Sequence, residues 1–132
     1  MRSASRSILL DTTVLIDVLH RRPKQIALLK QLIADGFELA TSCVNAGELY
    51  AGARPGEEAA TNALVGSLTC YDLTLSIARR AGEMVAVRRK AGKTHSLADM
   101  MIAATAMEHR CQLLTDNVRD FQVPGLALFP HL

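Results

Sequence analysis

Residues 7–17 read SILLDTTVLID, and this stretch decides the fold. The run at residues 8–10 is short, entirely apolar and ends at an acid, which is typical of a buried strand. Two threonines and the apolar residues 14–16 follow, so the strand is expected to turn directly into a helix. A buried strand joined to a helix is the repeating unit of an α/β protein.

The same alternation of short apolar strands and helices continues along the chain. Further strands are expected at residues 37–40, 68–73, 112–115 and 126–129. Further helices are expected at residues 23–35, 44–52 and 57–67, from a cap at Thr74 or Ser76 to about residue 91, and at residues 96–110. Strands that alternate with helices form a parallel sheet covered on both faces. The sequence therefore predicts an α/β fold, a three-layer α/β/α sandwich with a central parallel sheet of four or five short strands.

Length and composition indicate a globular protein of one domain. The 132 residues are 49% hydrophobic and 21% charged, which is enough apolar material for one core over residues 1–132. The net charge of +2 creates no strong overall field toward nucleic acid, so any anion-binding surface must be local. Aromatic residues make up 4% and tryptophan is absent, which excludes an aromatic stacking platform for single strands.

The sequence gives no indication of disulfides, zinc ligands or membrane segments. The three cysteines, Cys43, Cys70 and Cys111, are an odd number without a Cys-x-x-Cys spacing, which favours reduced, buried thiols. The apolar run at residues 8–10 is too short for a signal peptide, and the longest one, residues 100–104, is far from the roughly 20 residues of a membrane span. We therefore expect a soluble cytoplasmic protein without membrane association.

Two acids stand where an apolar environment is expected. Asp11 directly follows the first strand, at the carboxyl edge of the sheet, where α/β proteins bind their ligands. Its ordinary role would be to cap the next helix. Asp99 is, with Thr105, the only polar residue between positions 97 and 107, in a helix that is apolar nearly all round. Its ordinary role would be a capping box with Ser96.

Two further acids repeat this arrangement. Glu48 lies three residues after Asn45, so the two share a helix face, and a solvated surface glutamate is the ordinary alternative. Asp116 follows the strand at residues 112–115, again at a strand end, with Asp120 close behind. Each acid has an ordinary explanation, but four of them beside strand ends or within apolar helices favour a shared site.

A shared site for carboxylates requires a cation. Carboxylates that converge in a poorly hydrated cleft repel one another unless a positive charge neutralises them. Oxygen ligands without thiolates or paired histidines favour Mg²⁺, with Mn²⁺ as the alternative. Such a metal polarises a phosphate and activates water, so the pattern predicts metal-assisted hydrolysis of a phosphodiester.

Four segments, in a characteristic order, carry a resemblance to a known family. They are residues 9–17 (LLDTTVLID), Glu48-Leu49 followed by Gly52, residues 97–106 (LADMMIAATA) and residues 114–121 (LTDNVRDF). Together they resemble the PIN-domain ribonucleases, and most closely the VapC-type toxins of bacterial toxin–antitoxin pairs. The resemblance spans nearly the whole chain. It implies a Mg²⁺-dependent endoribonuclease that cleaves RNA, forms a homodimer and is inhibited by a small cognate antitoxin protein.

The resemblance also implies roles for individual acids. Asp11, Glu48 and Asp99 match the family's first three acids, which are catalytic residues and metal ligands. We assign the fourth position to Asp116, because it follows the strand most directly and a carboxylate complements a divalent cation better than an amide does.

Two rivals for that fourth position and three hydroxyl groups complete the implied site. Asn117 occupies the slot that the family commonly uses, and Asp120 lies in the Arg-Asp-Phe segment just beyond it. Thr12, Thr13 and Thr115 match hydroxyl positions that help to order the metal cluster. Roles as helix caps or strand ends are the ordinary alternatives for these threonines.

Basic residues gather before the helix of Asp99. The run at residues 88–90 contains Arg88 and Arg89, and Lys93 follows it. A solvated helix end is the ordinary interpretation, since cations suit the negative end of the helix dipole. Next to an acidic site, binding of RNA phosphates by Arg88, Arg89 and Lys93 is an equally good prediction.

Two other functions remain as alternatives. One is a PIN-like domain that binds RNA or a partner without catalysis, although the retained acids give it no support. The other is a phosphoaspartyl hydrolase or receiver-like domain with Asp11 as acceptor. That chemistry lacks here both the Asp-x-Asp after the first strand and a lysine at a later strand end.

Overall fold

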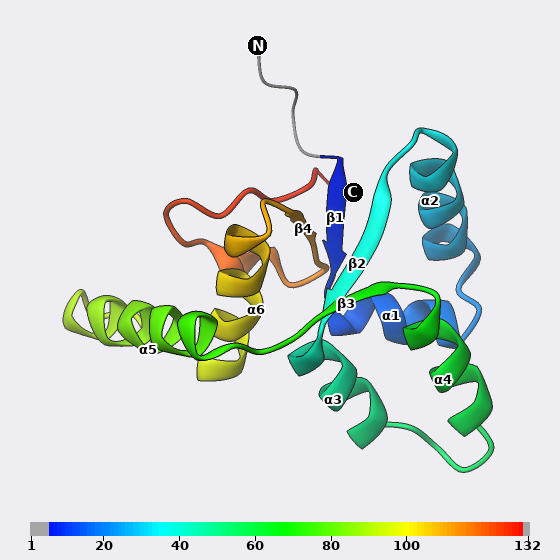
Figure 1. Cartoon of the computed structure of the whole chain (residues 1–132), viewed down its shortest axis with the longest axis horizontal. Coiled ribbons are helices and arrows are strands. Elements are labelled where there is room, and N and C mark those ends of the chain that lie inside the picture. The colour runs from blue at the N-terminus through cyan, green and yellow to red at the C-terminus, as the bar shows by residue number, and fades with distance from the viewer. Residues whose placement is uncertain (1–5, 131–132) are drawn as a thin grey trace.

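A four-stranded parallel sheet forms the centre of the protein (Figure 1). The computed structural model describes residues 6–130. The strands are β1 (Ser7–Leu10), β2 (Glu38–Ser42), β3 (Thr69–Tyr71) and β4 (Gln112–Leu114), in the order β3-β2-β1-β4. Every neighbouring pair is parallel. All four carboxyl ends therefore lie at one edge of the sheet.

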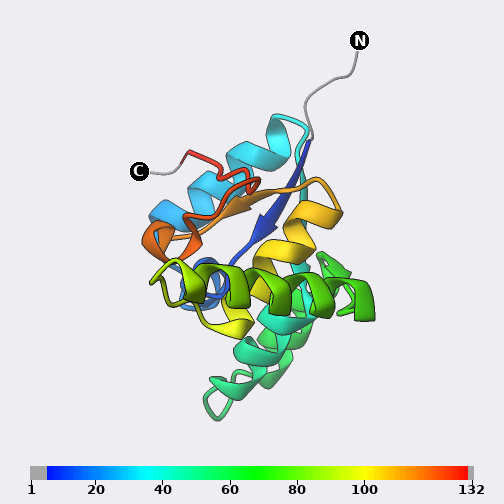
Figure 2. The same ribbon diagram turned by 90° about the vertical axis from the view of Figure 1, so that its left-hand side faces the viewer.

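Helices connect the strands, as the alternating pattern predicts. They are α1 (Thr12–Leu19), α2 (Pro23–Ala34), α3 (Cys43–Ala51), α4 (Glu58–Gly66), α5 (Leu75–Lys90) and α6 (Leu97–Glu108), followed by a short 3₁₀ helix, η1 (Val118–Phe121). Views along two directions show helices on both sides of the sheet, with α5 and α6 on one side and α1 and α2 on the other (Figures 1 and 2). The predicted three-layer α/β/α sandwich is confirmed.

The two faces of β1 explain the three layers. Leu9 packs into a core formed with α5 and α6, whereas Ile8 and Leu10 pack into a second core with α1 and α2. All three side chains are fully buried. Because successive side chains of a strand point to opposite faces, an unbroken apolar strand requires helices on both sides.

Four strand predictions differ from the structure at their boundaries. The strands predicted at residues 68–73 and 112–115 are shorter, at Thr69–Tyr71 and Gln112–Leu114. The predicted last strand at residues 126–129 is reduced to a single parallel bridge between Leu113 and Leu128, so the sheet has four strands. The strand predicted at residues 37–40 instead continues to Ser42. It does so because Thr41 and Ser42 are buried and pair with β3, although both residue types also suit a helix cap.

Hydroxyl side chains cap three of the helices, two of them at residues that the sequence predicts, Thr74 and Ser96. Ser42 accepts a hydrogen bond from the amide of Asn45, and Thr74 accepts one from the amide of Ile77, both at 3.1 Å. Ser96 caps α6 in the same way, through the amide of Asp99 at 3.0 Å. These caps satisfy amides that have no partner inside the helix. They also fix where α3 and α6, the two helices that carry acids of interest, begin.

The cysteines are free thiols, but only one of them is fully buried. Cys111 is buried, whereas Cys43 and Cys70 are half-buried, so the expectation of buried thiols is wrong for these two. Their sulfur atoms lie 3.7 Å apart, where the start of α3 meets β3. Burial, more than any charge, raises the pKa of the Cys70 thiol to about 11.

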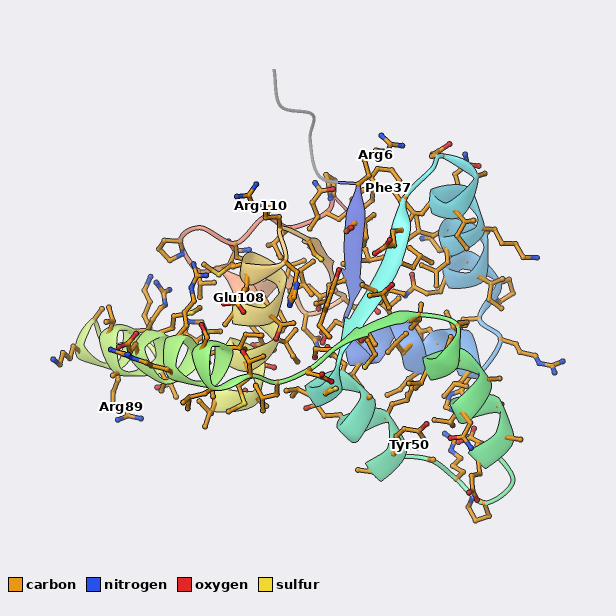
Figure 3. All side chains as sticks on the ribbon, viewed as in Figure 1. Arg6, Phe37, Tyr50, Arg89, Glu108 and Arg110 are labelled. Carbon is orange, nitrogen blue, oxygen red and sulfur yellow. The ribbon has the colours of Figure 1, made fainter. Side chains whose placement is uncertain are left out.

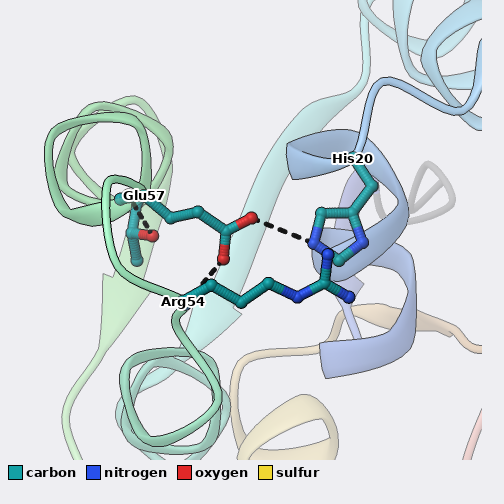
Figure 4. A network of polar contacts seen from close by, with 4 residues as sticks. His20, Arg54 and Glu57 are labelled. Atoms are coloured by element: carbon teal, nitrogen blue, oxygen red, sulfur yellow. Dashed lines mark hydrogen bonds and ion pairs between the residues drawn. The ribbon is translucent and has the colours of Figure 1, made fainter.

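A polar network joins α1 to the turn before α4 (Figure 4). Glu57 accepts a hydrogen bond from the backbone amide of Arg54 at 2.8 Å, and its other carboxylate oxygen lies 3.1 Å from His20 Nε2. The amide hydrogen bond, assisted by His20, holds the pKa of Glu57 below its usual value of 4.5. The ionised form of Glu57 therefore stabilises the folded state above that pH and loses this effect as the pH falls.

We expect Glu57→Gln to lower the melting temperature at pH 7, because glutamine cannot replace the charge beside His20. The difference from the wild type should be smaller at pH 3, because the stabilisation by ionised Glu57 is lost as the pH falls below 4.5 and through the lowered pKa of the folded state. Thermal unfolding followed by circular dichroism at both pH values measures it. Glu58→Gln, at the exposed neighbouring acid, is the matched control. Equal effects of the two variants at pH 7 would contradict this role for Glu57.

Candidate active site

Asp11 lies at the carboxyl edge of the sheet, between the ends of β1 and β4. Its backbone amide donates to the carbonyl of Leu114 at 3.0 Å, which continues the pairing of the two strands. The residue occupies the N-cap position of α1, but its side chain makes no capping hydrogen bond. The carboxylate instead points to other partners, although the residue is only 5% exposed. Its ordinary role as a helix cap is therefore not the one the structure shows.

Two side chains from distant parts of the chain hold the Asp11 carboxylate. Asn45 Nδ2, on α3, donates to Asp11 Oδ1 at 3.1 Å. Thr115 Oγ1, directly after β4, donates to Asp11 Oδ2 at 2.7 Å. Asn45 and Thr115 are themselves buried, so water does not compete for these hydrogen bonds. The carboxylate is thus fixed in orientation by one donor on each oxygen.

Asn45 also connects Asp11 to the second predicted acid. Its amide donates to Thr12 Oγ1 at 3.0 Å, and Thr12 Oγ1 donates to Glu48 Oε1 at 2.7 Å. Glu48 is exposed, as its ordinary interpretation predicts, but its side chain is hydrogen-bonded toward Asp11 and not free in solvent. The sequence placed Asn45 on the face of Glu48 and assigned it no role. The three-residue spacing between Asn45 and Glu48 is the sequence signal that could have identified Asn45 as a site residue.

Asp99 reaches the same region from the first turn of α6. Burial is the main cause that raises the pKa of its carboxyl, and the hydrogen bond with Ser96 opposes this shift. The negative charges of Asp11, Asp120 and Glu48 raise that pKa further. Four acids from four separate segments therefore share one electrostatic environment. That Asp11, Glu48 and Asp99 form one metal site stays a prediction.

The three candidates for the fourth position lie in different surroundings. Asp116 is exposed and accepts a hydrogen bond from Gln25 Nε2 at 3.3 Å, a side chain of α2 that also donates to Asp17. The backbone amide of Asn117 donates to Thr115 Oγ1 at 2.9 Å, which positions the start of η1. Asp120 lies on η1 and is the candidate whose charge acts on Asp99.

The predicted basic group is divided by the structure. Arg89 and Lys93 are exposed, and Figure 3 shows the Arg89 side chain extending away from α5. Arg88 is half-buried: its Nε donates to His95 Nε2 and its Nη2 donates to the carbonyl of Gln122, both at 3.0 Å. Arg88 is therefore bound to other segments of the protein, whereas Arg89 and Lys93 face solvent.

The donor chemistry of the site fits a hard divalent cation. The acids that act on one another provide only oxygen atoms, and their mutual repulsion is the electrostatic condition that a cation relieves. Over residues 6–130, no three acidic, histidine or cysteine side chains are close enough together to enclose an ion as they stand. Binding of an ion therefore requires these carboxylates to move closer together.

No helix within residues 6–130 is long and apolar enough to cross a membrane. Residues 8–125 match the PIN domain family. The chain is 37% identical to Ribonuclease VapC19 of Mycobacterium tuberculosis, over 94% of its length and 95% of the relative's. It is 38% identical to Ribonuclease VapC10 of the same organism, over 86% of its length and 85% of the relative's.

Among solved structures, the chain is similar to a toxin–antitoxin complex from Klebsiella pneumoniae. The TM-score is 0.72 and the identity 31%, with 95% of this chain and 96% of that chain covered. The matched range contains the strand ends and helices that bring the acids together. On the match of residues 8–125 and the identity to two ribonucleases over most of their length, the chain belongs to the PIN-domain family and, within it, to the VapC-type ribonucleases.

Proposed function

We propose that this VapC-type ribonuclease is a single-domain, Mg²⁺-dependent endoribonuclease that acts in the cytoplasm as the toxin of a type II toxin–antitoxin pair. PIN-domain ribonucleases are metal-dependent as a class, and Mg²⁺ is our choice of metal for this chain. One observation carries the proposal most directly. The charges of Asp11 and Glu48, on separate elements, act on the half-buried carboxyl of Asp99. Ionised acids placed in this way repel one another, and a cation bound among them relieves that repulsion.

In this proposal Asp11, Glu48 and Asp99 hold the metal through their carboxylate oxygens. When bound, Mg²⁺ polarises the RNA phosphate, activates a water molecule and stabilises the leaving oxygen. The chain's own contribution is orientation. Asn45 and Thr115 keep both oxygens of Asp11 in place, and their loss is expected to weaken metal binding, as is common for residues that support metal ligands.

Thr12 supports the second ligand. Its hydroxyl group donates to Glu48 and accepts from Asn45, which in turn donates to Asp11, so three hydrogen bonds connect the flexible glutamate to the rigid Asp11. This connection limits the rotamers of an exposed side chain before a metal arrives. The threonine is therefore proposed as a support of the site, together with Thr115.

The fourth position remains a proposal with two acidic candidates. Asp116 follows β4 most directly, and its hydrogen bond with Gln25 draws it toward α2. The negative charge of Asp120 raises the pKa of Asp99, which supports Asp120 as a member of the acidic site. We keep Asp116 as the proposed ligand, with Asp120 and the amide of Asn117 as supports, and the variants below decide between the two acids.

The partners follow from the family. A relative of 31% identity is solved as a toxin–antitoxin complex, which supports a cognate antitoxin for this chain. We further propose a homodimer and an RNA substrate whose phosphates contact the exposed Arg89 and Lys93. Arg89 lies in the last turn of α5 and Lys93 in the connection to α6, whose first turn carries Asp99.

We expect Asp11→Asn and Asp99→Asn each to reduce Mg²⁺-dependent RNA cleavage by more than about a hundredfold, because the loss of supporting residues alone commonly costs 10- to 100-fold. Cleavage of total RNA, followed on gels, measures the rate. Glu108→Gln, which removes an acid from the exposed end of α6, is the control. Folded Asp11→Asn and Asp99→Asn proteins with wild-type rates would overturn the catalytic assignment. Mn²⁺ binding by a wild type that cleaves no RNA would favour the binding-only alternative.

Without metal, Asp99→Asn should raise the melting temperature at pH 7. A raised pKa means that ionisation of Asp99 destabilises the folded state, so removing the charge is favourable above the usual pKa of 3.8. The advantage should disappear well below that pH, where the wild-type carboxyl is protonated in both states. Millimolar Mg²⁺ should stabilise the wild type more than the variant. Melting curves at pH 7 and pH 3, with and without Mg²⁺, measure these differences; a lower melting temperature for metal-free Asp99→Asn at pH 7 would contradict the repulsion.

The fourth ligand is decided by comparing Asp116→Asn, Asn117→Ala and Asp120→Asn in one assay. If Asp116 binds the metal, its variant should need about tenfold more Mg²⁺ for half-maximal cleavage, as expected for a lost charged ligand, and the other two should need less extra metal. Titration of cleavage rate against Mg²⁺ concentration gives these values. A near-normal Asp116→Asn beside a strongly impaired Asp120→Asn would transfer the role to Asp120.

A further inference from the structure

Arg88 stands apart from the exposed basic residues around it. Its guanidinium donates to His95 Nε2 and to the carbonyl of Gln122, and the side chain is half-buried. The two acceptors come from different segments, the connection between α5 and α6 and the end of η1. A guanidinium that is shared in this way between internal acceptors is poorly placed to follow an RNA backbone.

The hydrogen bonds of His95 are fixed by the chemistry of Arg88. A guanidinium only donates, so His95 Nε2 must accept and carries no proton. The proton of the neutral ring then lies on Nδ1, which is 3.2 Å from the carbonyl oxygen of Asp120 and donates to it. The ring therefore connects Arg88 to the backbone of η1: Nε2 accepts from Arg88, and Nδ1 donates to Asp120.

These contacts connect the turn after β4 to α5 and to the segment before α6. Residues 117–122 follow β4 at the active-site edge of the sheet, and most of their side chains are exposed, while Phe121 is buried in the core with α5 and α6. Arg88 and His95 donate hydrogen bonds to the backbone carbonyls of Gln122 and Asp120, which lie on either side of Phe121. The same turn carries the carboxylate of Asp120, whose charge acts on Asp99.

We propose that Arg88 and His95 are positioning residues, which hold η1 and the Asp120 carboxylate against the active-site acids, and that Arg88 serves cleavage through this turn and not as an RNA ligand. The inference rests on the proposed nuclease function and adds a division of labour to it. Arg89 and Lys93 face solvent and are available to phosphates, whereas Arg88 belongs to the internal framework of the site.

The test compares three arginines of one helix. Arg88→Met removes the two hydrogen bonds and keeps the apolar stem. Arg79→Met removes the same charge from an exposed position, where Arg79 pairs with Glu83 of the same helix. Arg89→Met removes it at a proposed RNA contact. The measurements are kcat, KM, the salt dependence of RNA binding and amide hydrogen exchange of residues 118–123.

We expect Arg88→Met to lower kcat by about ten- to a hundredfold, since small displacements of an active site have effects of this size. Exchange of residues 118–123 should become faster, while the salt dependence of RNA binding should match that of Arg79→Met. Arg89→Met should instead raise KM and reduce the slope of log affinity against log salt by about 0.7, as for one phosphate contact on a single strand.

His95 provides a second and independent set of variants, which also carries the test if Arg88→Met does not fold. His95→Ala should reproduce the loss in kcat and the faster exchange, and His95→Gln should restore part of both, because glutamine offers one acceptor and one donor. In combination with Arg88→Met, His95→Ala should add little, since both act through the same turn.

The outcomes separate this inference from the proposed function. Unchanged kcat and unchanged exchange in Arg88→Met and His95→Ala would overturn the positioning role. A salt dependence of Arg88→Met equal to that of Arg89→Met would make Arg88 an RNA ligand after all. A wild type that cleaves no RNA would overturn the nuclease proposal, and the exchange measurements would still decide whether Arg88 and His95 hold η1.

Discussion

The buried carboxylate of Asp11 is the constraint on which the rest of the site depends. A carboxylate removed from water is strongly unfavourable unless hydrogen bonds replace its hydration. Here Asn45 and Thr115 supply them, one for each oxygen. These donors come from α3 and from the residue after β4, so the Asp11 site exists only when β2 and β4 both flank β1 in parallel. The pairing of β2 and β4 with β1 therefore also assembles the Asp11 site.

The acids that gather around Asp11 work against the stability of the protein. Asp99 is half-buried in an apolar helix, and its ionisation is opposed both by burial and by the charges of Asp11 and Glu48. The destabilising charge is understandable as the counterpart of a metal ion, which would convert repulsion into binding energy. The apolar core between α5 and α6 supplies the stability that the acids remove.

The side of the molecule formed by α5, α6 and η1 has two kinds of basic residue with different roles. Arg89 is exposed at the end of a helix, whereas Arg88, its neighbour in sequence, is connected to His95 and to the backbone of Gln122. Helix geometry separates adjacent residues by about 100°, so one side chain faces the protein while the next faces solvent. A run of basic residues in a sequence is therefore not automatically one binding surface.

The sequence by itself determined the layers and the approximate positions of most elements, and it singled out three acids as site candidates, because these depend on local patterns. The apolar run before Asp11 required a buried strand, and Ser96 and Asp99 marked the start of α6 from their spacing alone. Only the tertiary structure decided the partners of these residues. Asn45 became the donor that joins Asp11 to Thr12, and Asp116 turned toward Gln25. These contacts join residues 33 to 91 positions apart. They cannot be predicted from the sequence because hydrogen bonding across the fold depends on strand order and helix rotation, which no local pattern encodes.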